Sequence, residues 1–218
     1  MDPSTQLVAA VRALIDTVRT SDLAEAEANG VDLAELALRI QSHISELAPH
    51  VVQSVPTQIG LRHAVSGLGA ERFARIADGV VLDIFPYSPI TGLLNPVAPP
   101  MQLWPDGSVV RGSGRIPTSL NGPPAGVHGG FVAAVLDELL GAAAVVAGLG
   151  GFTGTLTVRY LKLTPLDTDL DLAARVEASE GRKVIVTGEI SANGEVCATA
   201  EATFIRPADG ANLAIKSR

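Results

Sequence analysis

The chain has 218 residues, of which 47% are hydrophobic and only 4% aromatic, with 22 glycines and 14 prolines. This length suits one substantial domain with an extension, and the composition is not that of a disordered chain. The formal net charge of −7 argues against general nucleic-acid binding and offers no overall attraction to an anionic ligand.

Two amphipathic helices are predicted near the N-terminus. Apolar residues recur at helical spacing over residues 7–18 and again over 33–47, with Asn29-Gly30 between them and prolines beyond the second. Residues 57–78 are expected to add a short helix, and residues 79–85 a first strand. The start, MDPSTQL, lacks the basic region of a signal peptide, so we expect a cytoplasmic protein.

The next segment is rich in proline. Residues 95–100, NPVAPP, cannot form a central strand and are expected to be an irregular loop. Residues 101–104 and 108–114 then predict a hairpin around Asp106-Gly107.

Residues 121–138, NGPPAGVHGGFVAAVLDE, are the most informative part of the chain. A loop runs into His128-Gly129-Gly130, which opens an apolar helix predicted over 130–149. This helix approaches transmembrane length, but Asp137 and Glu138 in its middle argue for burial in protein. A buried carboxylate is costly without a partner, which marks the acids as candidate functional groups.

The spacing indicates a site shared between two chains. Nine residues from His128 to Asp137 advance a helix by roughly 13 Å, too far for both ends to act on one small substrate. Two such helices, antiparallel across a two-fold axis, would form two identical composite sites. The alternatives are a tight turn with a core histidine, and an acid pair at an interface.

Four strands are predicted after the helix, over residues 154–163, 169–178, 183–192 and 195–205, with Asn193-Gly194 as a two-residue turn. Cys197, the single cysteine, excludes an intrachain disulfide framework and is expected to pack in its strand. The fold class is therefore α+β, with one long helix and an antiparallel meander.

The HGG, the acid nine residues after its histidine and the later TLTVRYLKLTPL resemble the hotdog-fold thioesterases, specifically the PaaI-like (phenylacetyl-CoA thioesterase-like) group. The resemblance covers roughly residues 80–206. It implies a long central helix wrapped by an antiparallel sheet, with residues 1–78 as a helical extension, 79–207 as the hotdog domain and 208–218 as a tail. It also implies dimers whose sheets join edge to edge, with a dimer of dimers as the alternative. The extension would then pack on the outer sheet or a neighbouring subunit, or form a lid or wall of the acyl pocket.

The same resemblance implies roles for individual residues. Asp137 would activate water or attack directly, the Gly129 amide would polarise the thioester carbonyl, and Thr153 would help to hold the water. His128 and Asn121 would line the pocket. Gly130 and Thr155, the next hydroxyl on the same strand face, are added as substrate-binding residues.

Basic physical chemistry supports the choice of Gly129 and Gly130, because the first amides of a helix lack internal acceptors and suit an oxygen that gains negative charge. Glu138 points about 100° away from Asp137 and is the less suitable acid. Arg182 and Lys183, where a turn feeds a strand, are candidates for the phosphates of coenzyme A, the alternative being a solvated basic pair.

We therefore expect an acyl-CoA thioesterase. A hotdog dehydratase or hydratase and a non-catalytic acyl-CoA-binding protein are the alternatives. No nucleotide or metal motif is present in the sequence, so neither a cofactor nor a metal is expected. The expected partners are the acyl-CoA substrate and a second copy of the chain, without nucleic acid or membrane.

Overall fold

The computed structural model describes residues 3–51, 85 and 87–207. The helix predicted over 57–78, nearly all of the strand predicted over 79–85 and the tail lie outside these residues. Phe85 itself lies in a bend.

The N-terminal part contains three helices, α1 (Pro3–Thr20), α2 (Leu23–Ala28) and α3 (Leu33–Leu47), followed by the short turn η1 (Ala48–His50). The two long helices confirm the periodicity in the sequence. The short α2 was not predicted. It begins at Asp22, whose carboxylate accepts the Glu25 N–H at 3.0 Å, and α3 begins in the same way at Asp32. Such caps satisfy amides that a helix start leaves without partners.

Six strands form one antiparallel sheet in the order β1-β2-β4-β5-β6-β3. Their bounds are β1 Met101–Asp106, β2 Val109–Gly114, β3 Phe152–Tyr160, β4 Leu170–Glu180, β5 Lys183–Ala192 and β6 Glu195–Ile205. The predicted hairpin and the four later strands are confirmed with shifts of a few residues. Asn193 and Gly194 have φ of 53° and 77°, which fits the predicted two-residue turn. β3 is an edge strand although it precedes β4 in the chain.

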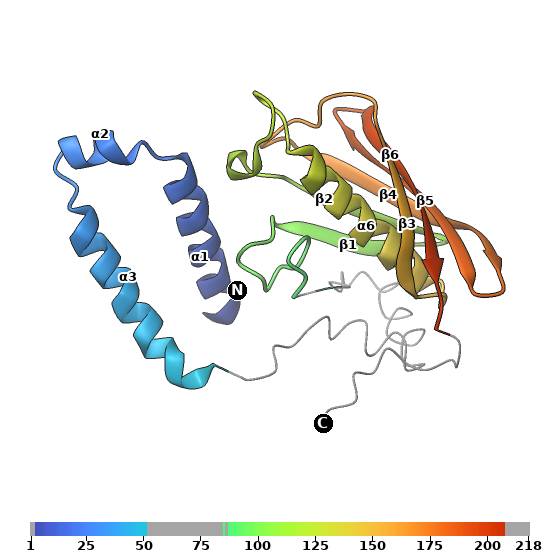
Figure 1. The fold of residues 1–218 in the computed structure, drawn as a ribbon, viewed down its shortest axis with the longest axis horizontal. Coiled ribbons are helices and arrows are strands. Elements are labelled where there is room, and N and C mark those ends of the chain that lie inside the picture. The colour runs from blue at the N-terminus through green and yellow to red at the C-terminus, as the bar shows by residue number, and fades with distance from the viewer. Residues whose placement is uncertain (1–2, 52–84, 86, 208–218) are drawn as a thin grey trace.

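The long helix α6 (Gly129–Val146) packs across one face of this sheet (Figure 1). It ends three residues earlier than predicted because Gly148, with φ of 72°, terminates it in the left-handed conformation. By length and composition α6 could cross a membrane, but half of it is buried within this chain. Its buried residues are Val132, Val135, Leu136, Leu139, Leu140, Ala142, Ala143, Ala144 and Val145.

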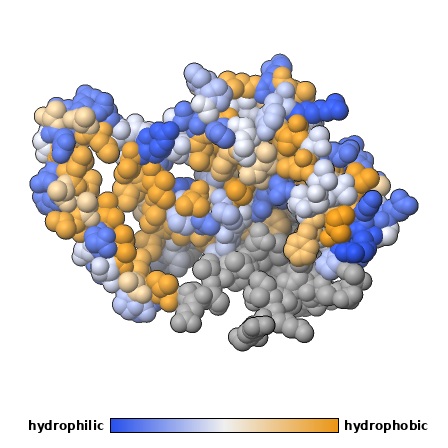
Figure 2. Space-filling view, in the orientation of Figure 1, coloured by the Kyte–Doolittle hydropathy of each residue, from blue (hydrophilic) through white to orange (hydrophobic). Residues whose placement is uncertain are grey.

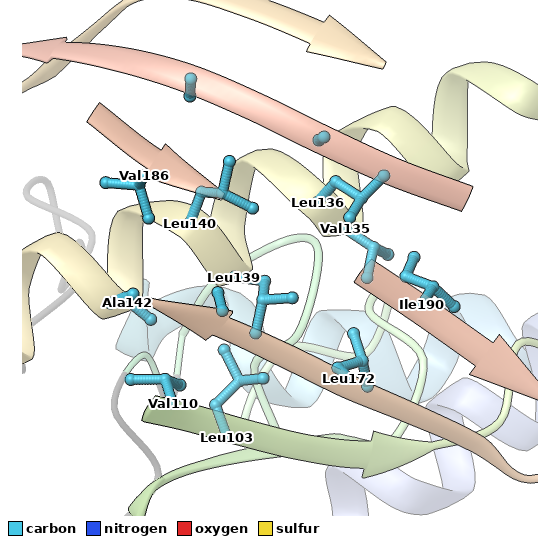
Figure 3. Packing of buried hydrophobic residues seen from close by; sticks show 14 of the residues in the cluster. Leu103, Val110, Val135, Leu136, Leu139, Leu140, Ala142, Leu172, Val186 and Ile190 are labelled. Atoms are coloured by element: carbon cyan, nitrogen blue, oxygen red, sulfur yellow. The ribbon is translucent and has the colours of Figure 1, made fainter. Parts of the chain in front are cut away.

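The core lies between α6 and the sheet. Leu139 points toward Leu172 and Leu103, and Val135 lies near Ile190 (Figure 3). At Gly188 in β5 a Cβ would come within 2.8 Å of Leu140 Cδ1, so the glycine allows helix and sheet to approach closely.

The N-terminal helices form an arm beside this layer (Figure 1). The expectation that they cover the outer sheet face is wrong for α1, which contacts the turn η4 (Thr118–Leu120) and the proline-rich loop. α3 buries none of its residues, and large apolar side chains on it, including Leu38 and Ile44, are exposed. Figure 2 shows hydrophobic residues gathered on both α1 and α3.

Candidate active site

His128 forms the N-cap of α6. Its Nδ1 accepts the N–H of Gly130 at 3.1 Å, and its own N–H donates to the Leu120 carbonyl at 3.0 Å. The Gly130 amide is therefore already used by the protein, and its predicted role in substrate binding does not hold in this conformation. The core-histidine alternative is also wrong, because His128 is exposed.

Gly129 is the first residue of α6, and its N–H meets no acceptor among the residues that the structure describes. Its carbonyl accepts the phenol of Tyr160 at 2.8 Å, which ties the end of β3 to the start of the helix. This amide carries the positive end of the helix dipole and could donate to a developing oxyanion.

Asp137 and Glu138 are adjacent in α6, so their side chains point about 100° apart around the helix axis. Each has a different hydrogen-bond partner. Thr153 donates a hydrogen bond to Asp137 Oδ1 at 2.9 Å, whereas Thr91 lies 3.5 Å from Glu138 Oε1. Thr91 is fully buried and Asp137 is half-buried. Glu138 is therefore held by the loop before β1, and Asp137 by the exposed edge strand where a substrate could reach it.

The backbone separates the two threonines that the sequence placed on one face. Thr153 pairs with the buried Phe204, but Thr155 pairs with Thr203, because a bulge intervenes in β3. Paired residues share a face of the sheet. Thr155 therefore points to the outer face, and its prediction as a neighbour of Thr153 in the site is wrong.

Within one chain the two halves of the predicted site lie at opposite ends of β3. Thr153, at the Asp137 end, and Tyr160, at the Gly129 end, are seven residues apart in the strand, roughly 23 Å at 3.3 Å per residue. Gly129 and Asp137 are eight positions apart in α6, about 12 Å along the helix axis. One chain therefore does not bring the amide and the acid together.

Asn121 precedes the loop that leads to His128 and is exposed. Its side-chain oxygen accepts a hydrogen bond from Arg19 of α1 at 3.1 Å. The structure thus places Asn121 near the start of α6, but pairs it with the N-terminal arm.

Arg182 and Lys183 lie at the turn between β4 and β5. Lys183 pairs with Ile205, which in turn pairs with Phe152, so the turn is at the Asp137 end of the sheet. Arg182 donates to the Arg206 carbonyl at 2.7 Å, whereas the Lys183 ammonium has no hydrogen-bond or ion-pair partner among the described residues.

Three contacts at this site involve residues that sequence reasoning did not select: Arg19, Thr91 and Tyr160. The contact of Tyr160 could have been expected from the sequence, because a tyrosine hydroxyl at the end of a strand usually finds a hydrogen-bond partner. The contacts of Arg19 and Thr91 could not be expected from the sequence, because their partners Asn121 and Glu138 lie 102 and 47 residues away in the chain. Among the described residues no group of three His, Cys, Asp or Glu side chains could hold a metal ion.

Comparison with curated proteins finds partial matches to acyl-coenzyme A thioesterases. THEM4 of Xenopus laevis is 38% identical over 86 residues, which is 39% of this chain and 39% of that protein. THEM5 of Homo sapiens is 35% identical over 68 residues, 31% of this chain and 28% of that protein. The matches thus span well under half the length of these curated relatives. No protein-family model matches the chain.

The crystal structure of a thioesterase superfamily protein superimposes on nearly the whole chain. The TM-score is 0.76 at 27% sequence identity, over 94% of this chain and 95% of that one. Because 94% of this chain is covered, the match includes the N-terminal helices as well as the layer of α6 on the sheet. These similarities agree with the resemblance drawn from the HGG segment and β3, and the chain shares its fold, a long helix packed on an antiparallel sheet, with that thioesterase superfamily protein.

Proposed function

We propose that this protein hydrolyses acyl-coenzyme A thioesters at a site completed by two subunits. The observation that carries the proposal concerns two groups held at opposite ends of an exposed edge strand. One is the Gly129 amide at the start of α6, which has no acceptor among the described residues, and the other is the mid-helix acid Asp137. The names of the curated relatives support the substrate class.

Each group has a defined part in the reaction. Asp137, oriented by Thr153, takes a proton from water, and the water oxygen forms a bond to the thioester carbon. The carbonyl oxygen gains negative charge and accepts a hydrogen bond from the partner subunit's Gly129 amide. Collapse of this intermediate breaks the carbon–sulfur bond, and coenzyme A leaves as a thiolate that takes up the proton. Direct attack by the carboxylate through an anhydride is the alternative.

The exposed edge of β3 supports a specific dimer. Leu156, Val158 and Tyr160 alternate toward α6, and the bulge brings Thr153 to the same face. If β3 pairs antiparallel with its copy about a two-fold axis at Thr157, Leu156 faces the partner's Val158. Thr153 then faces the partner's Tyr160. Since Thr153 holds Asp137 and Tyr160 holds Gly129, this register assembles both composite sites.

The experiment is a turnover screen over short, long and aromatic acyl-CoAs with two matched variants. Asp137→Asn removes the base without changing size, and kcat should fall by about 10²-fold or more while acyl-CoA still binds. Glu138→Gln, which alters the neighbouring acid held by Thr91, is the control and should retain turnover. Loss in Glu138→Gln with normal turnover in Asp137→Asn would refute the assignment, and enoyl hydration without hydrolysis would favour a lyase.

We further propose that Lys183, with Arg182 beside it, contacts the phosphates of coenzyme A. Single exposed contacts are weak, but a highly charged ligand engages several at once. Replacing both with Ala should raise KM for acyl-CoA and leave KM for an acyl-pantetheine thioester nearly unchanged. Equal rises for both substrates would contradict this contact, and they would also follow if loss of the Arg182 bond to the Arg206 carbonyl disturbed the sheet. Lys183→Ala alone removes that ambiguity.

A further inference from the structure

A cavity of about 560 Å³ lies between α1 and the hotdog layer. Such a volume falls within the range of about 300–1,000 Å³ typical of small-molecule pockets. α1 contributes one wall through residues that share a helical face. The rest of the lining is residues 96–100 with Arg115, Pro117, Ser119, Leu120 and Asp167. The α1 residues are Ala9, Arg12, Ala13, Ile15, Asp16 and Arg19.

The cavity does not offer cations to an anionic ligand. Arg12 donates to three backbone carbonyls of the proline-rich loop at 2.6–3.2 Å, and burial lowers the pKa of its guanidinium. Arg115 forms a two-bond ion pair with Asp169, and Arg19 is bonded to Asn121. Asp16 adds a carboxylate whose Oδ1 is buried without a hydrogen-bond partner among the described residues. Phosphate or a free carboxylate is therefore disfavoured here.

The remaining lining is mostly apolar: alanines, prolines, Ile15, Val97 and Leu120 present hydrocarbon surface. Its polar members are Ser119 and Asp167, and Asp167 already accepts a hydrogen bond from Thr118. Burial of apolar ligand surface against such walls is favourable. The chemistry of the walls thus fits an uncharged hydrocarbon group.

The cavity adjoins the amide half of the site. Leu120 lines it, and the Leu120 carbonyl accepts the N–H of His128, the residue before Gly129. Arg19 lines it as well and contacts Asn121. The cavity therefore lies close to the thioester carbonyl of a substrate bound at the Gly129 amide.

We infer that the cavity under α1 is the acyl-chain pocket, so that the N-terminal arm determines which acyl groups the enzyme accepts. The inference rests on the proposed thioesterase function. The chain enters beside Leu120 and Arg19 and extends along α1 toward its N-terminus, past Ala13 and then Ala9. Apolar acyl groups longer than acetyl are the class of substrate that such a pocket takes.

Two substitutions that fill the cavity test this. Ala13→Phe lies about 6 Å nearer to Arg19 than Ala9→Phe, at 1.5 Å per residue. The ratio of kcat/KM for a long acyl-CoA to that for acetyl-CoA should fall tenfold or more in both variants, and Ala13→Phe should exclude shorter chains than Ala9→Phe does. The control is Ala10→Phe, an exposed position of the same helix that does not line the cavity. It should keep the wild-type ratio.

The outcomes separate the two proposals. If the wild-type protein hydrolyses acyl-CoAs but Ala9→Phe and Ala13→Phe keep its chain-length preference, the acyl pocket lies elsewhere and the inference is overturned. The same holds if all three phenylalanine variants shift the ratio equally, because the effect is then on the arm as a whole. If the wild-type protein hydrolyses no acyl-CoA of any length, the thioesterase function itself fails.

Discussion

At the scale of single residues, two adjacent glycines have different chemistry. Gly130 gives its amide to the imidazole of His128, which leaves the Gly129 amide to point out of the helix start with no acceptor in the described part of the chain. The position of one hydrogen bond thus selects the donor that a substrate oxygen can reach.

Gly129→Pro should abolish this donor with little change to the fold. Proline is well accepted at the first position of a helix. His128 has ψ of 127°, which suits the residue before a proline, and a Cβ at Gly129 would lie 3.6 Å from the Tyr160 ring, an ordinary contact. Loss of one such donor typically costs about 10²–10³ in kcat. Gly129→Ala keeps the N–H and should keep most of the activity. Equal activity in both variants, with unchanged Tm, would show that the amide has no part in the reaction.

At the scale of elements, one exposed ion pair links the end of β2 to the start of β4. Arg115 follows β2 and binds Asp169, just before β4, at 2.6 and 2.9 Å. This bond lowers the pKa of the Asp169 carboxyl below its ordinary value near 3.8 and raises that of the arginine.

The direction of this shift predicts a pH dependence. Because the folded carboxyl has the lower pKa, its contribution to stability is present above the unfolded value and is lost as pH falls through the folded one. Asp169→Asn should therefore lower Tm slightly at pH 6–7, and the difference from wild type should shrink as pH falls below the ordinary carboxyl value near 3.8. Thermal unfolding followed by circular dichroism across that range measures this. Asp171→Asn, at an exposed position of β4 two residues later, is the control, and a difference that persists at low pH would assign the effect to something other than the ion pair.

At the scale of the whole molecule, the part of the chain that the structure describes has an edge strand, β3, and an N-terminal arm that both expose large apolar side chains. Phe152 and Tyr160 on β3 are 62% and 55% exposed, and long unpaired edges are sites of association. The proposed dimer covers this edge and completes the sites at once.

Cross-linking tests the register of that dimer. With the two-fold axis at Thr157, the two copies of this residue face each other at about 4.5–5.5 Å between Cα atoms, within reach of a disulfide. Thr157→Cys should form a covalent dimer on mild oxidation, seen by non-reducing electrophoresis. The native Cys197 is buried, which raises the pKa of its thiol and limits background reaction. Thr199→Cys, on the neighbouring β6, should stay uncross-linked, and a cross-link there alone would exclude the β3 dimer.

Mixed dimers test whether each site uses both chains. Asp137→Asn and Gly129→Pro should each be inactive alone. Co-expressed in equal amounts, they should assort into dimers of which half are mixed, and each mixed dimer has one intact site, so activity should return to about a quarter of wild type. Recovery near zero from a verified mixed population would place amide and acid in the same subunit.

The sequence by itself determined most of the described elements, and it predicted a chemistry for the site. Hydrophobic period and turn residues predicted α1, α3, α6 and the later strands, since these signals are local to each segment. The HGG segment and the acid nine residues later led to two predictions, a resemblance to hotdog thioesterases and a site split between chains. Those features depend on residue type and spacing, which the sequence contains in full.

Only the tertiary structure decided which groups remain available for that chemistry. The bulge turned Thr155 away from Thr153, Arg19 reached Asn121 across 102 residues, and Thr91 was placed against Glu138. It also decided that β3 lies at the edge and that α1 encloses a cavity. The physical reason is that a hydrogen bond or a cavity depends on side chains brought together by packing, and residues distant in the chain leave no periodic signal of their contact.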